Sequence, residues 1–390
     1  MKKILLFAFA ALLLVAFTAP AMAATKKVSF YGDIRFNTYW VHADEDYYNN
    51  GLGDSDSDLM WEPDTADSRF GAKFAEGPIT ANVEIRPRRS LWPTAKDTAT
   101  NTKAFQQYWR QWWGSWNFGP ASLLIGFTYV PGCIAYSQSQ FDSENIVCYG
   151  CFMDELRAFQ MKLTVPFSFG KLTVAAIEPP GKWLPGLYGG VDGWAAASTD
   201  YDYKIPKLEA RLDFNINPAQ ITLLGGYYTF DIVDKSTEKD ESVDSYMYGA
   251  RVVVPFGPAY VKGHYVYVQN PADFGDLSSV GLGYKNMLYD PATGDTEDAD
   301  YYSYGGVVGY QINDMVGVEA GYFYQKTERY KDEEDPNCQY YIVFPIRPIK
   351  GVTIYPEIGV VDEKDVTDAS GDSTDQGKRT YFGAYWKINF

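Results

Sequence analysis

The chain has no long apolar run beyond its first residues. Downstream stretches such as Val252–Phe256 stop after a few residues, well short of the ~20 that a membrane-spanning helix needs. Histidine is scarce, with 2 in 390 residues, which leaves little material for a His-centred catalytic site. Basic charge is also in the minority, with 34 lysines and arginines against 50 acidic residues. This balance argues against nucleic acid as a partner.

The one long apolar run lies at the N-terminus and predicts export. Lys2 and Lys3 precede the almost wholly apolar run Ile4–Phe17, and Ala21-Met22-Ala23 fits a small-x-small cleavage site. We therefore expect residues 1–23 to be a cleaved signal peptide and residues 24–390 to form a single domain. An exported chain without a spanning helix can enter a membrane only as a closed β-barrel, because only helices and closed barrels satisfy every backbone polar group in lipid.

The composition favours a barrel as well. The chain carries 32 Tyr, 23 Phe and 10 Trp, yet its mean hydropathy is −0.28. A barrel combines a high aromatic content with a low mean hydropathy, because each strand has only one apolar side and aromatic girdles mark both membrane interfaces. The acidic residues gather in runs, which we interpret as solvated loops on one rim: Asp44–Asp46, Asp54–Asp58, Asp234–Glu241, Asp295–Asp300, Asp332–Asp335 and Asp362–Asp375.

Short turns alternate with long polar segments, and this alternation predicts the number of strands. Each turn is flanked by stretches long enough for the ~9–11 residues with which a strand crosses a bilayer. Seven tight turns between eight long loops give sixteen strands, with both termini on the short-turn side. The turns are Glu76–Pro78, Phe118–Pro120, Pro166–Gly170, Asn217-Pro218, Pro255–Pro258, Ile312–Met315 and Pro348–Gly351.

The alternation of apolar and polar residues within the predicted strands supports an all-β fold, a transmembrane antiparallel barrel. In Lys207–Ile216 apolar and polar residues alternate without a break, as expected when one face meets lipid and the other meets the lumen. Ile79–Arg86 and Val352–Val360 alternate in the same way. A single strand of this kind is weak evidence, but its repetition at regular spacing is strong evidence.

The end of the chain carries a resemblance. Reading back from the C-terminus in steps of two gives one apolar face: Phe390, Ile388, Trp386, Ala384 and Phe382. This resembles the closing strand of bacterial outer-membrane barrels. In length, strand count, signal peptide and terminal Phe390, the chain is similar to the trimeric sixteen-stranded general porins of Gram-negative outer membranes. The Pro-Glu-Phe-Gly loop motif of enterobacterial porins is absent, which indicates a divergent branch.

The resemblance implies a function and a location. Such a protein would lie in the outer membrane as a homotrimer, in contact with lipid and lipopolysaccharide. It would form a water-filled channel for passive diffusion of ions and small hydrophilic solutes, without a cofactor or enzymatic activity. The resemblance also implies that the loop after the fifth strand, about Pro131–Asp154, folds inward and narrows the pore.

Alternate residues of each predicted strand face the lumen, and on this assignment five arginines lie on one side of the inner wall. Like charges this close repel unless water or carboxylates compensate them, and rings of charge are how pores select ions. We therefore predict that this basic wall acts on permeating ions. The alternative is a salt-bridged lumen with partners such as Asp33 and Glu84. The arginines are Arg35, Arg69, Arg86, Arg88 and Arg110.

The proposed inward loop carries acids of its own. Asp142, Glu144 and Asp154 lie in it, and the resemblance implies that they face the arginines and set a transverse field across the constriction. The alternative is an ordinary surface loop like the others.

Four cysteines in an exported chain predict disulfides, with three possible connectivities. A local bridge from Cys133 to Cys148 or Cys151 is the first expectation. The second joins the remaining loop cysteine to Cys338 across the lumen, because the fourteenth strand lies opposite the root of the loop. Cys338 shares parity with the lipid-facing Tyr340, so this bridge requires the strand to fray. An oxidising compartment favours disulfides over a zinc site, and we expect no metal site.

Two other functions remain open. A substrate-specific channel for sugars or anions would use an aromatic surface such as Trp109, Trp112, Trp113 and Trp116, although tryptophan in barrels more often marks the membrane interfaces. An outer-membrane barrel enzyme would need His42 or His264, and neither has a serine or aspartate at a telling spacing.

Overall fold

The computed structural model describes residues 26–47, 56–64, 67–86, 109–141, 157–179, 191–192, 199–234, 239–274, 287–289, 296–329 and 333–390. The predicted signal peptide lies outside these residues. Within them, no helix is long and apolar enough to cross a membrane.

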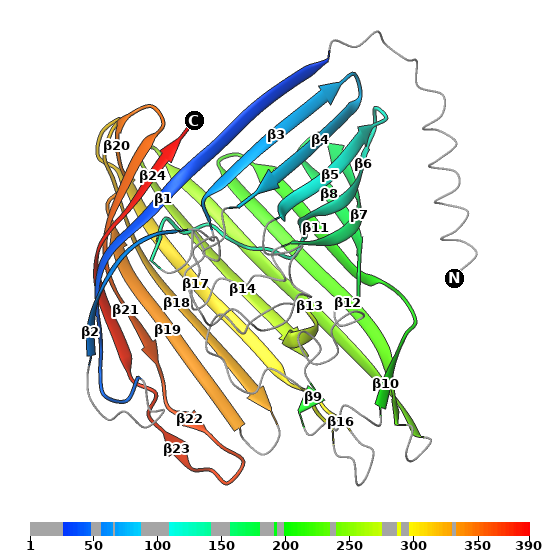
Figure 1. Ribbon diagram of the computed structural model, residues 1–390. Coiled ribbons are helices and arrows are strands. Elements are labelled where there is room, and N and C mark those ends of the chain that lie inside the picture. Colours follow the sequence, from blue (N-terminus) through cyan, green and yellow to red (C-terminus); the bar gives the residue numbers. More distant parts are fainter. Residues whose placement is uncertain are drawn as a thin grey trace, which may run out of the picture.

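The described residues form a closed antiparallel β-barrel of sixteen strands (Figure 1). Three barrel strands are interrupted, so that β2 continues as β3, β10 as β11, and β19 as β20. The strands are β1 (Lys27–Ala43), β2 (Asp56–Pro63), β3 (Arg69–Glu76), β4 (Ile79–Ile85), β5 (Trp109–Asn117), β6 (Ser122–Tyr129), β7 (Arg157–Phe167), β8 (Gly170–Ile177), β10 (Thr199–Tyr203), β11 (Lys207–Ile216), β12 (Ala219–Asp234), β13 (Lys239–Phe256), β14 (Ala259–Gln269), β17 (Asp300–Gln311), β18 (Gly317–Arg329), β19 (Glu333–Val343), β20 (Ile346–Ile349), β21 (Val352–Glu363) and β24 (Lys378–Asn389).

The barrel closes between its first and last strands. β1 pairs with β24 from Asp33 opposite Asn389 to Ala43 opposite Arg379. The terminal residue extends this ladder: the amide of Phe390 donates to the carbonyl of Gly32 at 2.9 Å, and the main-chain oxygen of Phe390 accepts from the amide of Gly32 at 3.0 Å. Closure leaves the sheet without free edges.

Seven tight turns join consecutive strands at the end of the barrel where the C-terminus lies (Figure 1). Each of the seven turns predicted from the sequence lies at such a connection. Small elements lie near the other end of the barrel: η3 (Pro271–Asp273), the hairpin of β22 (Val366–Thr367) and β23 (Ser373–Thr374), and a three-stranded sheet of β9 (Val191–Asp192), β15 (Met287–Tyr289) and β16 (Thr296–Glu297).

The predicted alternation is confirmed by exposure. On β11 the side chain of Leu208 is 40% exposed, whereas its neighbours Lys207 and Glu209 are 0% and 1% exposed. β21 shows the same contrast, with Ile358 at 53% and Glu357 at 4%. Apolar residues therefore cover the outer wall, and charged residues point into the barrel.

Two irregularities position polar groups inside. The register of β4 against β5 shifts by one residue, so that Glu84 lies opposite Gln111 while Ile85 lies opposite Trp109. Such a bulge re-aims side chains, and it brings Arg110 inward beside Gln111. A second break separates β2 from β3, where the hydroxyl of Ser68 accepts a hydrogen bond from the amide of Arg35 at 3.0 Å.

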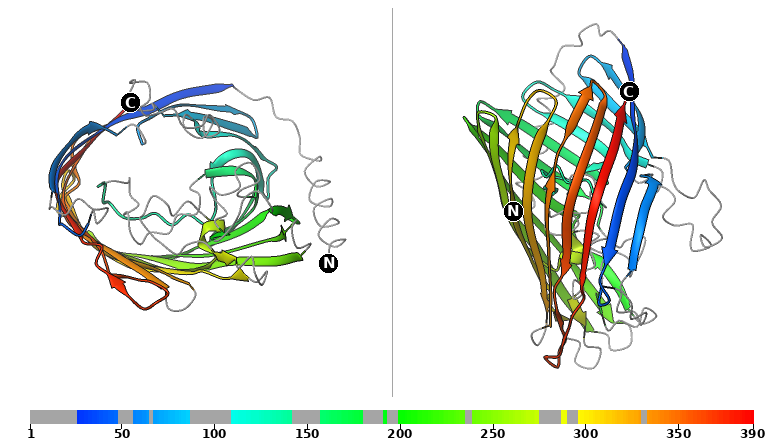
Figure 2. Two further views of the ribbon diagram at one scale, coloured as in Figure 1. Left: turned by 60° about the horizontal axis from the view of Figure 1, so that its bottom comes forward. Right: turned by 90° about the vertical axis from the view of Figure 1, so that its left-hand side faces the viewer.

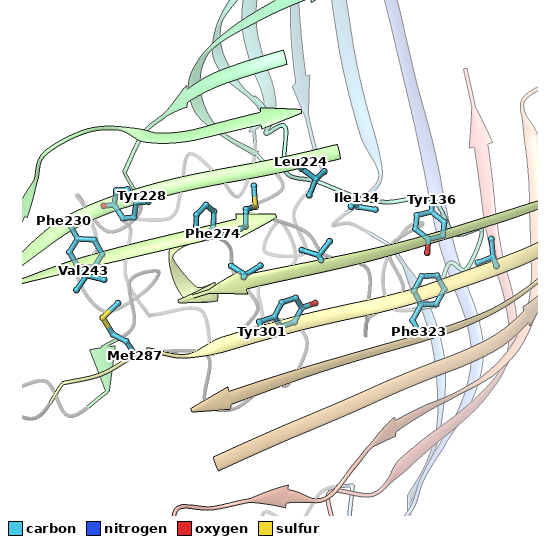
Figure 3. Packing of buried hydrophobic residues seen from close by; sticks show 14 of the residues in the cluster. Ile134, Tyr136, Leu224, Tyr228, Phe230, Val243, Phe274, Met287, Tyr301 and Phe323 are labelled. Carbon is cyan, nitrogen blue, oxygen red and sulfur yellow. The ribbon is translucent and has the colours of Figure 1, made fainter. Parts of the chain in front are cut away.

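Part of the inner wall is apolar, which the sequence pattern did not predict. Inward residues of β12, β13, β14, β17, β18 and β19 form one buried cluster (Figure 3). It includes Phe230, Tyr301 and Phe323 from the strands, and Ile134 and Tyr136 from the segment that follows β6. The segment covers part of this apolar wall, since the rings of Tyr136 and Phe323 lie 5.7 Å apart between centroids.

Candidate functional site in the barrel interior

The segment Val130–Phe141 leaves the end of β6 and lies inside the barrel (Figure 2). Ile134, Ser139 and Phe141 are all 0% exposed. Apart from a turn at its start, the segment has no regular secondary structure, so its backbone groups need partners on the barrel wall. This inner segment is the described part of the loop that was expected to fold inward.

Three inward glutamates from three different strands supply acceptors for it. Glu209 on β11 accepts from the amide of Gly132 at 2.8 Å. Glu319 on β18 accepts from the amide of Gln138 at 2.5 Å. Glu357 on β21 accepts from the amide of Gln140 at 2.8 Å and the hydroxyl of Ser139 at 2.5 Å. Hydrogen bonds to an ionised acceptor are stronger than neutral ones, so these carboxylates fix the path of the segment.

Tyrosine hydroxyls of the barrel wall donate further hydrogen bonds to two of these glutamates. The carboxylate of Glu357 also accepts from the hydroxyl of Tyr381 at 2.9 Å. That of Glu319 accepts from the hydroxyls of Tyr260 at 2.7 Å and Tyr341 at 2.8 Å. A buried carboxylate is costly unless it is hydrogen-bonded, and here each receives several donors.

Basic side chains bind the carbonyl groups of the same segment. Lys262 on β14 donates to the carbonyl of Tyr136 at 2.8 Å, and Arg211 on β11 donates to that of Cys133 at 3.0 Å. At the end of the segment, the ring of Phe141 stacks on Tyr381 with centroids 3.7 Å apart. The inner segment is thus held along its whole described length.

His264 belongs to this set of contacts. Its Nδ1 lies 2.7 Å from the hydroxyl of Tyr136, and its Nε2 lies 3.0 Å from the hydroxyl of Ser303. The Ser303 side chain is 0% exposed, so a substrate in the lumen cannot reach its hydroxyl. This geometry is that of a structural anchor for the inner segment.

The arginines of the predicted basic wall are paired with acids. Arg35 meets Asp33 through two hydrogen bonds, at 2.6 and 3.0 Å, and Arg69 lies 3.3 Å from the same carboxylate. Arg110 contacts Glu84 and Asp67, each at 3.0 Å. Carboxylates therefore compensate these three arginines, and their predicted action on permeating ions stays a prediction. The arginines and their carboxylates form a salt-bridged wall, which was the alternative.

Other predicted site residues have different outcomes. Arg86 is half-buried immediately after β4. Six predicted site residues lie outside the described part of the chain: Arg88, Asp142, Glu144, Cys148, Cys151 and Asp154. Within the described residues, no group of three His, Cys, Asp or Glu side chains is arranged to hold a metal ion.

The predicted bridge from Cys338 across the lumen is wrong. Cys338 is a free cysteine, 3% exposed. It lies on the outward face of β19 and interacts with the hydroxyl of Tyr322, an outward residue of β18. The pairing of β19 with β18 and β21 is regular through this position, so the strand does not fray and the thiol cannot turn inward.

The four tryptophans that a substrate-specific channel could have used do not share one face of their strand. Trp112 is 52% exposed on the outer wall. Trp113 points inward, and its indole donates to the side chain of Gln111 at 2.9 Å. One strand cannot present adjacent residues to the same face, so tryptophans at neighbouring positions separate.

Sequence reasoning missed the role of the three glutamates. The alternation placed Glu209 and Glu357 inside the barrel, and that signal was correct. It does not show which inward acids meet the inner segment, because these contacts join residues 77 to 217 positions apart.

Comparisons with known proteins place the fold. No protein-family model and no curated protein matches the chain. Among solved structures, the outer membrane channel DcaP of Acinetobacter baumannii has a TM-score of 0.65 at 14% identity, covering 95% of this chain and 100% of that one. A loop-deletion mutant of OmpT, an outer membrane protein of Vibrio cholerae, has a TM-score of 0.57 at 14% identity, covering 94% and 99%. The fold is that of the sixteen-stranded porins.

A third similar structure is the anion-selective porin from Comamonas acidovorans, with a TM-score of 0.54 at 13% identity, covering 94% of this chain and 100% of that one. All three similarities span nearly the whole of both chains. The porin fold therefore accounts for this barrel from end to end.

Proposed function

We propose that the protein is an outer-membrane porin, a channel for passive diffusion of ions and small hydrophilic solutes. The observation that carries this proposal is the inner segment, held inside a charged lumen by Glu209, Glu319 and Glu357. A segment anchored in this way narrows a wide barrel without plugging it by a separate domain, which is what a size-limiting pore needs. The similar folds of known channels and porins support the proposal.

The salt-bridged wall sets the electrostatics that we propose for the pore. Arg35, Arg69 and Arg110 alternate with Asp33, Asp67 and Glu84 on one side of the lumen. Because opposite charges lie about 3 Å apart, their fields cancel over short distances. We therefore propose weak ion selectivity at this wall, with local polar contacts that replace part of a solute's hydration shell.

The proposal also covers export, location, the acids of the constriction loop and the loop disulfide. Residues 1–23 would be removed on export, and the barrel would reside in the outer membrane in contact with lipid and lipopolysaccharide. Asp142, Glu144 and Asp154 would border the narrow part of the pore. Cys133 would form a disulfide with Cys148 or Cys151, which by the chain-entropy model stabilises the fold by ~3 kcal/mol.

The test is conductance in planar lipid bilayers. Purified protein should give discrete, ohmic current steps, with reversal potentials in a salt gradient that report only weak selectivity. Folded protein that inserts into the bilayer without current steps would refute the channel. Hydrolysis of lipid or peptide by the same preparation would instead favour a barrel enzyme.

A further inference from the structure

One of the two histidines of the chain lies inside the barrel, against the middle of the inner segment. His264 on β14 is 8% exposed. Its ring contacts two aromatic rings, with centroid distances of 5.4 Å to Tyr136 of the inner segment and 5.9 Å to Phe323 of β18. Tyr136 and Phe323 also lie against each other, 5.7 Å apart (Figure 3). The imidazole is therefore packed among aromatic rings and withdrawn from water.

The hydrogen bonds around this ring fit its neutral form. The hydroxyl of Tyr136 donates its only proton to the carbonyl of Gly305 at 3.0 Å. The same oxygen therefore accepts from the Nδ1–H group of His264, at 2.7 Å. In the neutral ring Nε2 then carries no proton and accepts from the hydroxyl of Ser303 at 3.0 Å. This single tautomer satisfies both ring nitrogens and both hydroxyls.

Burial is the main cost of placing a second proton on the ring. Two cations add to this cost: Lys262 lies two positions away on the same face of β14, and Arg251 of β13 is the ladder partner of His264. Glu319 of β18 acts in the opposite sense, but its carboxylate already lies 3.4 Å from Lys262. The other groups that contact the ring, from β17, β18 and the inner segment, carry no charge at neutral pH: Ser303, Gly305, Phe323 and Tyr136.

We propose that His264 is an acid-sensitive latch for the middle of the inner segment. In water a histidine side chain takes up a proton near pH ~6.5. A ring that has left its packed position gains that proton readily, whereas the packed ring resists it. Acidification therefore favours the state in which Tyr136 is released, while Glu209 and Glu357 still hold the two ends of the segment. The proposal rests on the proposed channel function only for its consequence, which is a wider or less steady pore at low pH.

The direct test is hydrogen exchange of residues 134–138 in the full-length barrel in detergent, between about pH 8 and about pH 5. After correction for the intrinsic rate, exchange in the wild type should accelerate by up to ~tenfold for each pH unit below ~6.5, because release takes up one proton. His264→Asn keeps an N–H donor near the position of Nδ1 but cannot gain a charge. This variant should lose the acceleration.

The matched control is His42→Gln, which changes the other histidine of the chain. His42 stacks on the outward Trp40 and contacts the hydroxyl of Ser57, so this variant should accelerate like the wild type. Wild-type exchange that does not accelerate on acidification would overturn the proposal. The same acceleration in His264→Asn, or its loss in the control, would do so as well.

A second variant covers the case in which His264→Asn does not fold. Tyr136→Phe keeps the ring contacts and removes the hydroxyl that meets His264. Its residues 134–138 should exchange faster than those of the wild type at neutral pH and should respond less to acid. Exchange equal to that of the wild type at every pH would overturn the latch.

Conductance separates the latch from the channel itself. In planar bilayers, the current steps of the wild type should become larger or noisier between about pH 7 and about pH 5, and this change should be absent in His264→Asn. Acid-dependent exchange without any current would overturn only the proposed channel. Current steps combined with exchange that does not depend on pH would overturn only the latch.

Discussion

At the scale of the residue, Glu357 joins the inner segment to the barrel wall. Its carboxylate accepts from Ser139, Gln140 and Tyr381, and it is 4% exposed. Each of these donors would need another partner if the charge were removed. The residue therefore couples the position of the inner segment to the stability of the barrel wall.

Glu357→Gln should lower the free energy of unfolding by ~1.5–3 kcal/mol. The amide keeps the shape of the side chain but loses the charge that strengthens these hydrogen bonds, and its NH₂ group faces donors. Urea unfolding of the folded barrel measures the change. The control Glu76→Gln alters an exposed residue 3.6 Å from Lys26 and should change the stability by less than ~0.5 kcal/mol. Equal effects of the two changes would contradict the assigned role.

Arg110→Gln should make the pore more cation-selective. The change leaves Glu84 and Asp67 without their shared guanidinium group, so the wall gains net negative charge. Reversal potentials in dilute salt should shift towards the cation value, and the shift should shrink at high salt, where the Debye length falls from ~10 Å at 0.1 M to ~3 Å at 1 M. Arg329→Gln, a change to an arginine that pairs with Glu333 at 2.8 Å near the opposite end, serves as the control.

A shift in Arg329→Gln as large as that in Arg110→Gln would show that selectivity follows total charge. An unchanged reversal potential in Arg110→Gln would show that the salt-bridged wall does not border the narrow part of the pore.

At the scale of the element, strands and turns were predictable from the residues, and the inward path of the inner segment was expected from the resemblance, but the contacts that hold it were not. Which residues of β11 face the lumen can be predicted because apolar and polar residues alternate in Lys207–Ile216. A turn such as Gly257-Pro258 can be predicted because glycine and proline favour turn conformations. The bulge at Arg110 depends on pairing with β4, which one strand cannot reveal. A salt bridge between Arg110 and Glu84 was one of the two alternatives. The alternation of inward and outward residues alone could not show whether the inward arginines repel one another or pair with carboxylates.

The contacts of the inner segment were beyond sequence reasoning for a related reason. Glu319 and Gln138 meet at 2.5 Å although 181 residues separate them. Their meeting is fixed by barrel closure and by the path of an irregular segment. Phe323 is an inward apolar residue and breaks the polar-inside pattern because Tyr136 of the inner segment covers it.

The short element η3 gives a prediction about pH. Asp273 lies in it, beyond the end of β14 and fully buried, and burial raises the pKa of its carboxyl to about 7 despite a hydrogen bond from Ser245 and the charge of Lys207. Because this folded-state pKa lies above the ordinary value of 3.8, the neutral form stabilises the packed state. That stabilisation is complete at low pH and is lost as the pH rises through about 7.

Hydrogen exchange of residues 270–274 should therefore accelerate as the pH rises from about 6 to about 8, after correction for the intrinsic rate. Asp273→Asn should remove this dependence, because the amide does not ionise. A corrected rate that stays constant in the wild type over this interval would contradict the prediction.

At the scale of the whole molecule, the outer wall around the closure is broadly apolar. Phe30 is 71% exposed on β1, and Phe382 and Ile388 are 51% and 53% exposed on β24. Lipid covers such a surface in a membrane, and a second copy of the barrel covers it in a trimer. Sedimentation in detergent should show a heat-stable trimer, and Phe30→Lys with Phe382→Lys should shift it to monomers. A wild type that sediments only as a monomer would contradict the proposed assembly.

The most direct measurement of the central claim is single-channel conductance of the wild type beside the double variant E319Q/E357Q. The wild type should give steady, uniform current steps. The variant should give larger or noisier steps, because two of the three carboxylates that hold the inner segment are gone while the barrel stays closed. Identical steps from both proteins would contradict a segment that sets the width of the pore, and folded wild-type barrels without any steps would contradict the channel.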